Sequence, residues 1–322
     1  MGPPYTLLIR KPNFFIVGAP KCGTTAMSEY LAQHPDVFMP VKELHFFGSD
    51  LHFSPHVDNF KTPRDDKETE KYLSFFAPAI REKMVGESSV WYLYSKTAAS
   101  EIRAFSPSAK IIIMLRNPVD MLFSLHSQFL WEGGESIENF EEALKAEKER
   151  KKGLNIPDTV YFVSQLFYTE VVKYTAQIER YLDTFGKESV HVIIFDEFKK
   201  NTQKIYRETL HFLGIEDNFQ SSFKVINPNK VIRYKRLQRI LRNPVHPFRK
   251  MGKKIIPQVV RSVLYRKFQS HNTQFIARPA MNPETKKMLT ETFAGEIDSL
   301  SEILGKDLTF WKNGIIDEKI TF

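Results

Sequence analysis

The chain has 322 residues, of which 42% are hydrophobic and 26% charged, and its formal net charge at pH 7 is +8. This length suffices for one large α/β domain or two small ones, and the composition is that of a soluble globular protein. No apolar run reaches the ~20 residues of a membrane-spanning helix, and the single cysteine, Cys22, excludes an internal disulfide and fits the reducing cytoplasm, where we expect the protein.

Strands and helices are predicted to alternate over residues 13–215. Short apolar, β-branched runs predict strands over residues 13–19, 83–86, 110–115 and 189–195. Helical patterns follow over residues 24–33, from Pro118 onward, and over residues 137–152, 164–185 and 201–213, the last stopping at Gly214. This alternation predicts right-handed βαβ units, and hence a P-loop-like, three-layer α/β/α fold with a central parallel sheet. Functional groups are then expected beyond the carboxyl ends of the strands.

The C-terminal part is strongly basic. Residues 218–283 hold fifteen of the 46 Lys and Arg residues and no acid, which leaves 31 basic against 38 acidic residues elsewhere. Segments 231–242 and 255–268 are apolar on one stripe and basic on the other, and residues 283–304 predict a final packed helix. We expect one domain over residues 1–322, in which a basic helical cap (216–322) covers the α/β core (13–215). A positive field favours anionic partners, although a solvated basic surface explains the same composition.

The first strand runs into a loop that is almost a phosphate-binding P-loop. In FIVGAPKCGTT (15–25), Gly18 and Gly23 have the G-x-x-x-x-G spacing, and Thr25 stands at the metal-binding hydroxyl position. The position of the P-loop lysine is Thr24, and a lysine appears three residues earlier, at Lys21. Backbone N–H groups of such a loop, together with the helix dipole, form an anion cradle.

The strand 110–115 ends in Arg116, where a metal-holding acidic residue would be expected. An arginine repels magnesium and attracts a second phosphate. The sequence therefore predicts a site for a nucleotide anion without a metal. A sulfuryl group carries less charge than a phosphoryl group, so it can dispense with a metal clamp, and Lys21 can steady the bridging oxygen as it leaves.

Three segments carry a resemblance to a known family. GAPKCGTTAMSEYL resembles the 5′-phosphosulfate loop of sulfotransferases that use 3′-phosphoadenosine 5′-phosphosulfate (PAPS). LRNPVDMLFSLHSQ looks like their 3′-phosphate-binding segment, and VIIFDEF with the later FLGI is similar to a further strand–helix unit of the family. The resemblance covers roughly residues 13–215, and more loosely the C-terminal part. It implies that PAPS is bound by Lys21, Cys22, Gly23, Thr24, Thr25, Arg116 and Ser124.

The basic segment NPNKVIRYKRLQRILRN is similar to a loop that closes over the nucleotide in bacterial members of the family. This similarity implies that Lys230, Arg233 and Arg236 are candidates for binding the 3′-phosphate, although several of them can equally face water. Phe195 is a candidate for stacking near adenine, with a buried strand residue as the alternative.

VKELHFFGSD resembles the carbohydrate-type branch of the family, which includes the heparan sulfate N- and 3-O-sulfotransferases and their bacterial relatives. The matching glutamate there is taken to be the general base, which implies this role for Glu43. A carboxylate beside aromatic rings can have a raised pKa and act near neutrality, although a solvated loop glutamate is the simpler alternative. His45 is a further catalytic candidate that orients the base or contacts the acceptor, or else it is a structural histidine.

GESSVWYLYS departs from the family pattern. Related enzymes often have a sulfate-facing lysine directly after the glutamate, where this chain has Ser88 after Glu87. Lys42 or a basic residue of the cap is a candidate replacement. Trp91 and Tyr92 can line an acceptor groove, although packing in the core is the more common use of such residues.

The sequence thus predicts an enzyme, a PAPS-dependent sulfotransferase that acts on a hydroxyl or amine of a saccharide or glycan-like acceptor. An anionic or membrane-associated acceptor, and peripheral membrane contact, are left open, and no nucleic acid is expected. Two alternatives come from other classes of protein. One is a degenerate P-loop kinase or NTPase, and the other is a membrane or nucleic-acid binder that uses the basic cap.

Overall fold

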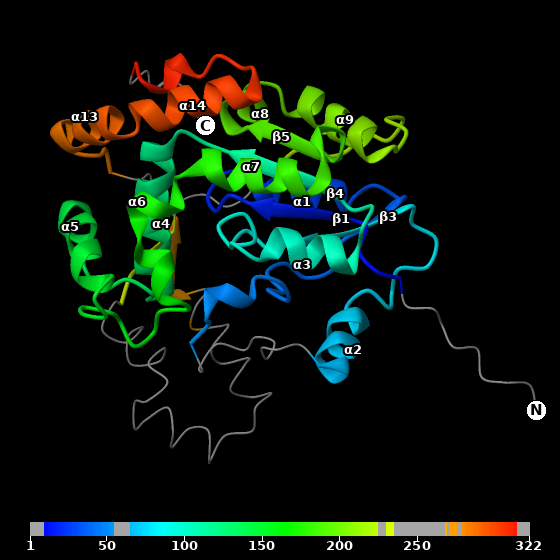
Figure 1. Cartoon of the computed structure of the whole chain (residues 1–322), viewed down its shortest axis with the longest axis horizontal. Coiled ribbons are helices and arrows are strands. Elements are labelled where there is room, and N and C mark those ends of the chain that lie inside the picture. The colour runs from blue at the N-terminus through cyan, green and yellow to red at the C-terminus, as the bar shows by residue number, and fades with distance from the viewer. Residues whose placement is uncertain are drawn as a thin grey trace, which may run out of the picture.

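The computed structural model describes residues 10–54, 65–224, 230–234, 268, 271–275 and 279–313. Its core is a five-stranded sheet in the order β2-β3-β1-β4-β5, and every pair of neighbouring strands is parallel. The strands are β1 (Phe14–Gly18), β2 (Val37–Phe38), β3 (Met84–Ser88), β4 (Lys110–Leu115) and β5 (Val190–Ile194). The predicted parallel α/β sheet is therefore confirmed. Figure 1 shows the sheet in the middle of the molecule with helices around it.

Burial explains why the strands read as continuous apolar runs. All five residues of β1 and of β3 are buried, because helices cover both faces of the sheet. β1 lies between β3 and β4, and Phe15 pairs with Glu87 on one side and with Ile111 on the other. The carboxyl ends of β1, β3 and β4 are thus neighbours, and the loop of residues 18–25, the residues after Ser88 and the segment that starts at Arg116 begin there.

Helices from distant parts of the chain pack on the sheet in two groups. α3 contacts α7, and α14 packs against α7 from outside, whereas α1 contacts α9. Figure 1 shows α13 and α14 running along one edge of the molecule, above α7. The helices are α1 (Thr24–Leu31), α2 (Asp66–Ser74), α3 (Ala98–Phe105), α4 (Pro118–Glu132), α5 (Phe140–Arg150), α6 (Tyr168–Val171), α7 (Tyr174–Phe185), α8 (Phe195–Lys200), α9 (Thr202–Leu213), α13 (Pro283–Thr292) and α14 (Ala294–Leu304).

The prediction of one long helix over residues 164–185 is wrong. The segment consists of a 3-10 turn (Val163–Leu166), the short α6 and then α7. The backbone N–H and the hydroxyl of Thr169 donate to the carboxylate of Glu147 on α5, at 2.8 and 2.6 Å. The hydroxyl of Tyr168 donates to the buried Glu135 at 2.9 Å. These contacts fix α6 against α5 and the loop that follows α4, so the chain turns before α7 begins.

The predicted helix 283–304 is also two helices, which meet at the buried Phe293 with φ −96° and ψ 5°. The region predicted as a helical cap also contains a short antiparallel pair, β6 (Lys230–Ile232) and β7 (Thr273–Phe275), and β6 packs along α4. Most of segments 231–242 and 255–268 lies outside the described residues, so the amphipathic helices predicted there stay predictions. Within the described part of the chain, no helix is long and apolar enough to cross a membrane.

Candidate active site

The loop between β1 and α1 has the geometry of an anion cradle. Gly23 is the N-cap of α1 in the left-handed conformation, with φ 88° and ψ 6°, and it supplies no side-chain cap to the first amides of the helix. A Cβ at Gly23 would lie 2.9 Å from Cδ2 of Phe195, so the loop passes too close to α8 for any side chain. The N-terminal amides thus lie at the positive end of the α1 dipole without a side-chain cap from Gly23, an arrangement that suits an anion.

Lys21 leans from the loop toward α4. Its backbone has φ 64°, a conformation that few residues other than glycine adopt. Its Nζ donates to Oε1 of Gln128 at 3.0 Å, and the amide of Gln128 donates in turn to Glu132. The predicted catalytic lysine is therefore held by a residue that the sequence analysis missed, although Gln128 follows Ser124 by one helical turn.

Cys22 is buried, and its Sγ donates to the carbonyl of Pro20 at 3.4 Å. Burial raises the pKa of the thiol to about 12, and the positive charges of Arg116 and Lys21 partly oppose the shift. Both cations therefore act on the same loop. With a neutral, enclosed thiol, Cys22 can contribute to a ligand only through its backbone.

Arg116 and Phe195 lie on the other side of the loop. Arg116 directly follows β4, and its guanidinium is 5.1 Å from the centre of the Phe195 ring and 3.9 Å from Asp120. Phe195 is half-buried and begins α8, so the reading of Phe195 as a buried strand residue is wrong. The strand ends one residue earlier, and the ring is free to pack against Gly23 and Arg116 instead.

Trp311, a residue near the C-terminal end of the chain, hydrogen-bonds to both α8 and the residue that precedes α4. The indole N–H of Trp311 donates to Asp196 on α8 at 2.9 Å, and its carbonyl accepts from the side chain of Asn117 at 2.9 Å. Asn117 also caps α4 by accepting from the N–H of Val119. Nothing in the sequence indicates this bridge, because its partners are more than a hundred residues apart.

Ser124 lies on α4, two turns after Arg116, and only 2% of it is exposed. The Arg116 side chain is 22% exposed, so it is the more accessible of the two predicted 3′-phosphate residues. Of the basic residues from the cap, Lys230 is described only as part of the β6 backbone, and Arg236 lies outside the described residues. Arg233 is exposed, and its guanidinium is 5.8 Å from the Tyr234 ring. The roles of these three residues stay predictions.

Glu43 is held above the end of β3. Its N–H donates to the carbonyl of Ser88 at 2.9 Å, and its carboxylate accepts from the N–H of Val90 at 3.1 Å. The surrounding protein desolvates the carboxyl and raises its pKa, an effect that Lys42 opposes. The side chain is still 36% exposed to water, so solvent screens part of this effect. The carboxyl is thus partly desolvated, and its role as the general base stays a prediction.

His45 lies beside the carboxylate, with its Nε2 3.5 Å from an oxygen of Glu43. Burial lowers the pKa of the imidazole to about 4, so the ring is neutral at neutral pH. Its Nδ1 is buried and has no hydrogen-bond partner within the described ranges, and the ring packs on Phe53 at 5.0 Å. Glu43 and His45, like Lys21, have positive φ angles, 62° and 52°. Backbone strain of this kind tends to collect at functional sites.

Lys42 joins the two loops. Its Nζ lies 3.0 Å from Oγ1 of Thr25 and 3.4 Å from Oγ1 of Thr24, at the start of α1, and 3.8 Å from Oε1 of Glu43. The predicted anion cradle and the predicted base are therefore adjacent in space, although they lie some twenty residues apart in sequence.

A buried carboxylate supports the Glu43 loop from below. Glu87 is fully buried and accepts hydrogen bonds from Tyr72, Ser89 and Tyr92 at 2.6, 2.6 and 2.8 Å. Burial raises its pKa to about 7. Tyr92 in turn accepts from the N–H groups of Phe46 and Phe47, and Ser89 accepts from that of His45. Trp91 and Tyr92 are buried, so the core-packing interpretation of both residues is confirmed.

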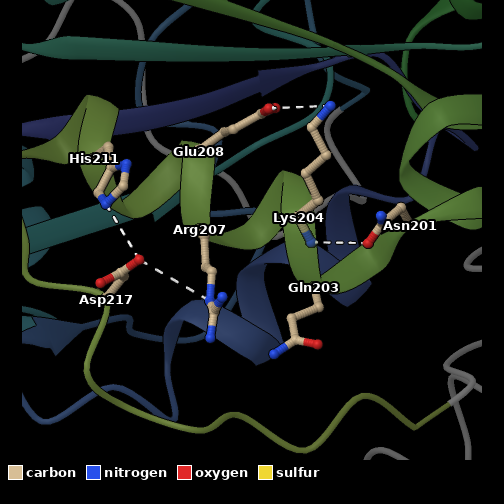
Figure 2. Close-up of a pocket in the computed structure, with 7 residues that line it drawn as sticks. All are labelled: Asn201, Gln203, Lys204, Arg207, Glu208, His211 and Asp217. Atoms are coloured by element: carbon tan, nitrogen blue, oxygen red, sulfur yellow. Dashed lines mark hydrogen bonds and ion pairs between the residues drawn. The ribbon is translucent and has the colours of Figure 1, made fainter.

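A separate hollow of about 370 Å³ lies on the outer side of α9 (Figure 2), where Lys204 pairs with Glu208 and His211 with Asp217. It shares no residue with the site built around Lys21 and Glu43. Over the described ranges, no group of three or more His, Cys, Asp or Glu side chains has a geometry that could hold a metal ion.

Comparisons with known proteins bear on the family and the fold of this chain. The family model described as "Sulfotransferase domain" matches residues 11–299. The crystal structure of a sulfotransferase from Alicyclobacillus acidocaldarius superposes with a TM-score of 0.67 at 30% identity, over 94% of this chain and 99% of that one.

Two curated relatives are more distant. Membrane-associated sulfotransferase kil1 of Dictyostelium discoideum is 22% identical over 298 residues, 70% of this chain and 60% of that protein. Heparan sulfate glucosamine 3-O-sulfotransferase 5 of Mus musculus is 25% identical over 189 residues, 59% of this chain and 49% of that protein. The chain thus spans less than two thirds of the length of these two relatives.

Proposed function

Because this chain belongs to the sulfotransferase domain family, we propose that it transfers a sulfuryl group from PAPS to a hydroxyl or amine of an acceptor. One observation carries the proposal. The anion cradle, which includes the cation Lys21, lies next to a desolvated carboxylate, Glu43, and the side chain of Lys42 contacts both. A nucleotide-binding loop alone would serve many activities, whereas the added base selects group transfer to an acceptor that must lose a proton.

The loop residues fit the 5′-phosphosulfate end of PAPS. The uncapped amides of Thr24 and Thr25 lie at the positive end of α1, and the backbone approach at Gly23 leaves no room for a Cβ. Cys22 offers its backbone to the same end. Arg116, with Ser124 behind it, is the proposed 3′-phosphate site, and the half-buried Phe195 ring beside Arg116 is an apolar surface for adenosine.

PAPS supplies an activated sulfuryl group: a new S–O or S–N bond forms to the acceptor while the S–O bond to the 5′-phosphate breaks. The bonding pair stays on the oxygen of the 5′-phosphate, and 3′-phosphoadenosine 5′-phosphate is left. Lys21, released from Gln128, stabilises the negative charge on that oxygen. Glu43 takes the proton of the acceptor, and the N–H of Val90 holds the carboxylate in place.

His45 acts on Glu43 as a neutral imidazole, since burial keeps its pKa near 4. A neutral ring 3.5 Å from the carboxylate can donate one N–H to it without the strong pKa depression that an imidazolium would cause. This arrangement preserves the basicity of Glu43 while restricting its orientation.

For the acceptor, we propose a saccharide or glycan-like metabolite. The support is the match to carbohydrate-acting relatives, one of which is named for the 3-O position of heparan sulfate glucosamine. The part of the chain that covers Lys230, Arg233 and Arg236 is strongly basic, which fits an anionic acceptor or co-substrate.

Isothermal titration with 3′-phosphoadenosine 5′-phosphate and with adenosine 5′-phosphate, in buffer containing EDTA, tests the nucleotide site. We expect the bisphosphate to bind at least about tenfold more tightly, and Arg116→Gln to remove this preference. The control is Arg207→Gln on the outer face of α9, which should leave it unchanged. Equal affinities in the unmodified protein, or nucleotide binding only with magnesium, would contradict the assignment and favour an NTPase.

An acceptor screen with isotope-labelled PAPS, read by the mass gain of one SO₃ group, tests the transfer itself. We expect modified hydroxyl- or amine-bearing saccharides. Tight nucleotide binding with labelling of phenols or steroids alone would reject the proposed acceptor class while leaving the nucleotide site intact.

A further inference from the structure

We propose that Lys42 is a second catalytic cation that contacts the sulfuryl group as it crosses from the nucleotide cradle to the acceptor. The inference rests on the proposed function and adds to it a residue that precedes the base in sequence. Lys21 then stabilises the charge on the leaving oxygen of the nucleotide, and Lys42 stabilises the charge on the non-bridging oxygens of the sulfuryl group during transfer.

The position of the ammonium group carries the proposal. Nζ of Lys42 lies within hydrogen-bond reach of the hydroxyls of Thr24 and Thr25, the first two residues of α1. It also lies 3.8 Å from Oε1 of Glu43. The sulfuryl group must pass between the α1 amides and the base, and among the described residues Lys42 is a cation that lies close to both of them.

In the structure, the other two cations of the described site contact other groups. Lys21 is hydrogen-bonded to Gln128 on α4, and Arg116 lies against Phe195 and 3.9 Å from Asp120. At the end of β3, Ser88 contributes a buried hydroxyl that has no hydrogen-bond partner among the described residues, and its side chain brings no positive charge to this side of the site. Lys42 supplies it from the neighbouring loop.

The environment of Lys42 prepares it for an anion. Its side chain is 20% exposed, and burial lowers the pKa of the ammonium group, with Glu43 and the more distant Glu29 opposing the shift. Within the part of the chain that the structure describes, its hydrogen bonds go to two neutral hydroxyls, and its nearest carboxylate is 3.8 Å away. The ammonium group is desolvated by burial, and its hydrogen bonds go to neutral hydroxyls. A hydrogen bond to the negatively charged oxygen of an incoming sulfuryl group is therefore strongly favourable.

Lys42 also acts on the base. Its positive charge lowers the pKa of Glu43, against the desolvation that raises it. The other groups that face Glu43 are the neutral His45, the N–H of Val90 and, through charge, the buried Glu87. Removing the charge of Lys42 should therefore raise the pKa of Glu43 and move the acid limb of the rate profile to higher pH.

The test uses Lys42→Met, which keeps the length of the side chain without its charge, and Lys42→Arg, which keeps the charge. Lys83→Met is the matched control, because Lys83 also pairs with one carboxylate, Asp36, but lies at the opposite end of β3. Turnover with PAPS, its pH profile, and affinity for 3′-phosphoadenosine 5′-phosphate are measured for each variant, with thermal unfolding as a check of folding.

For Lys42→Met we expect turnover to fall on the order of 10²-fold, as for the loss of one charge-stabilising donor. Affinity for the desulfated nucleotide should stay within about threefold, because that ligand lacks the group that Lys42 contacts. The acid limb should shift upward, and Lys42→Arg should recover part of the rate. Lys83→Met should match the unmodified protein in every measurement.

Two outcomes would overturn the role. If turnover of Lys42→Met stays within about threefold of the unmodified protein, Lys42 makes no catalytic contact. If turnover and nucleotide affinity fall equally, Lys42 only positions Thr24 and Thr25 at the start of α1. If the unmodified protein itself fails to bind the nucleotide or to transfer sulfate, the proposed function is wrong. Measuring the unmodified protein therefore separates a failure of the proposed function from a failure of the role of Lys42.

Discussion

Replacing Gly23 by alanine tests the shape of the cradle. Gly23 has φ +88°, where an alanine costs about 1–2 kcal/mol relative to glycine. Its Cβ would lie 2.9 Å from Cδ2 and 3.0 Å from Cε2 of Phe195, and relieving such overpacking costs about 1–3 kcal/mol more. The expected loss of unfolding free energy is therefore about 2–5 kcal/mol.

The chain offers a matched control for this substitution. Gly153 has a similar φ of +83°, but a Cβ there would meet nothing within 4 Å. Gly153→Ala should thus cost only the backbone term, about 1–2 kcal/mol. The difference between the two variants isolates the contact with Phe195.

Denaturant unfolding and titration with 3′-phosphoadenosine 5′-phosphate measure the two consequences. Gly23→Ala should unfold at a clearly lower denaturant concentration than Gly153→Ala, and it should bind the nucleotide at least about tenfold more weakly, a change of about 1.4 kcal/mol. Gly153→Ala should bind it normally. If both variants have equal stability and unmodified affinity, the tight approach of the loop to Phe195 is not what shapes the site, and the reasoning is refuted.

Three further predictions concern the base, the C-terminal bridge and the buried carboxyl. Glu43→Gln should lower turnover about 10²- to 10⁴-fold in a rate assay and leave nucleotide affinity unchanged; a rate near that of the unmodified enzyme would remove Glu43 as the base. Trp311→Phe removes the N–H that donates to Asp196, a part-buried hydrogen bond worth about 1 kcal/mol. Titration should then show a several-fold weaker preference for the 3′-phosphorylated nucleotide, and an unchanged preference would limit Trp311 to packing. Because the pKa of Glu87 is raised from 4.5 to about 7, its contribution to stability is complete below pH 4.5 and is lost as pH rises toward 7 and above. Glu87→Gln should therefore flatten the fall in unfolding free energy over this range, and an identical pH profile would contradict the shift.

The sheet and the position of the site could be predicted because their signals are local. β4 is found at the residues predicted for it, and β1 and β5 are each one residue shorter at both ends. These strands could be recognised because runs such as KIIIML are apolar on both faces of a parallel strand. The order of motifs then placed the loops after β1, β3 and β4 at one edge. The two-residue strand β2 has too little pattern to be recognised, and the sequence analysis also missed α2 and α3.

The interruptions and bridges could not be predicted because their causes are distant in sequence. The break before α7 depends on Thr169 bonding to Glu147, and the anchoring of α8 depends on Trp311. A helical pattern indicates which side chains are apolar. It does not predict that a backbone N–H will donate to a carboxylate on another helix. The same holds for Lys42, whose contacts with Thr25 appear only after β1 and β3 are paired.

The most direct test of the account is a crystal structure of the protein soaked with 3′-phosphoadenosine 5′-phosphate. We expect the 5′-phosphate at the N-terminus of α1 between Lys21 and Thr25, and the 3′-phosphate beside Arg116, with no metal between protein and ligand. Nucleotide lodged elsewhere, or reversed so that its 3′-phosphate occupies the α1 cradle, would contradict the proposed site and the chemistry that depends on it.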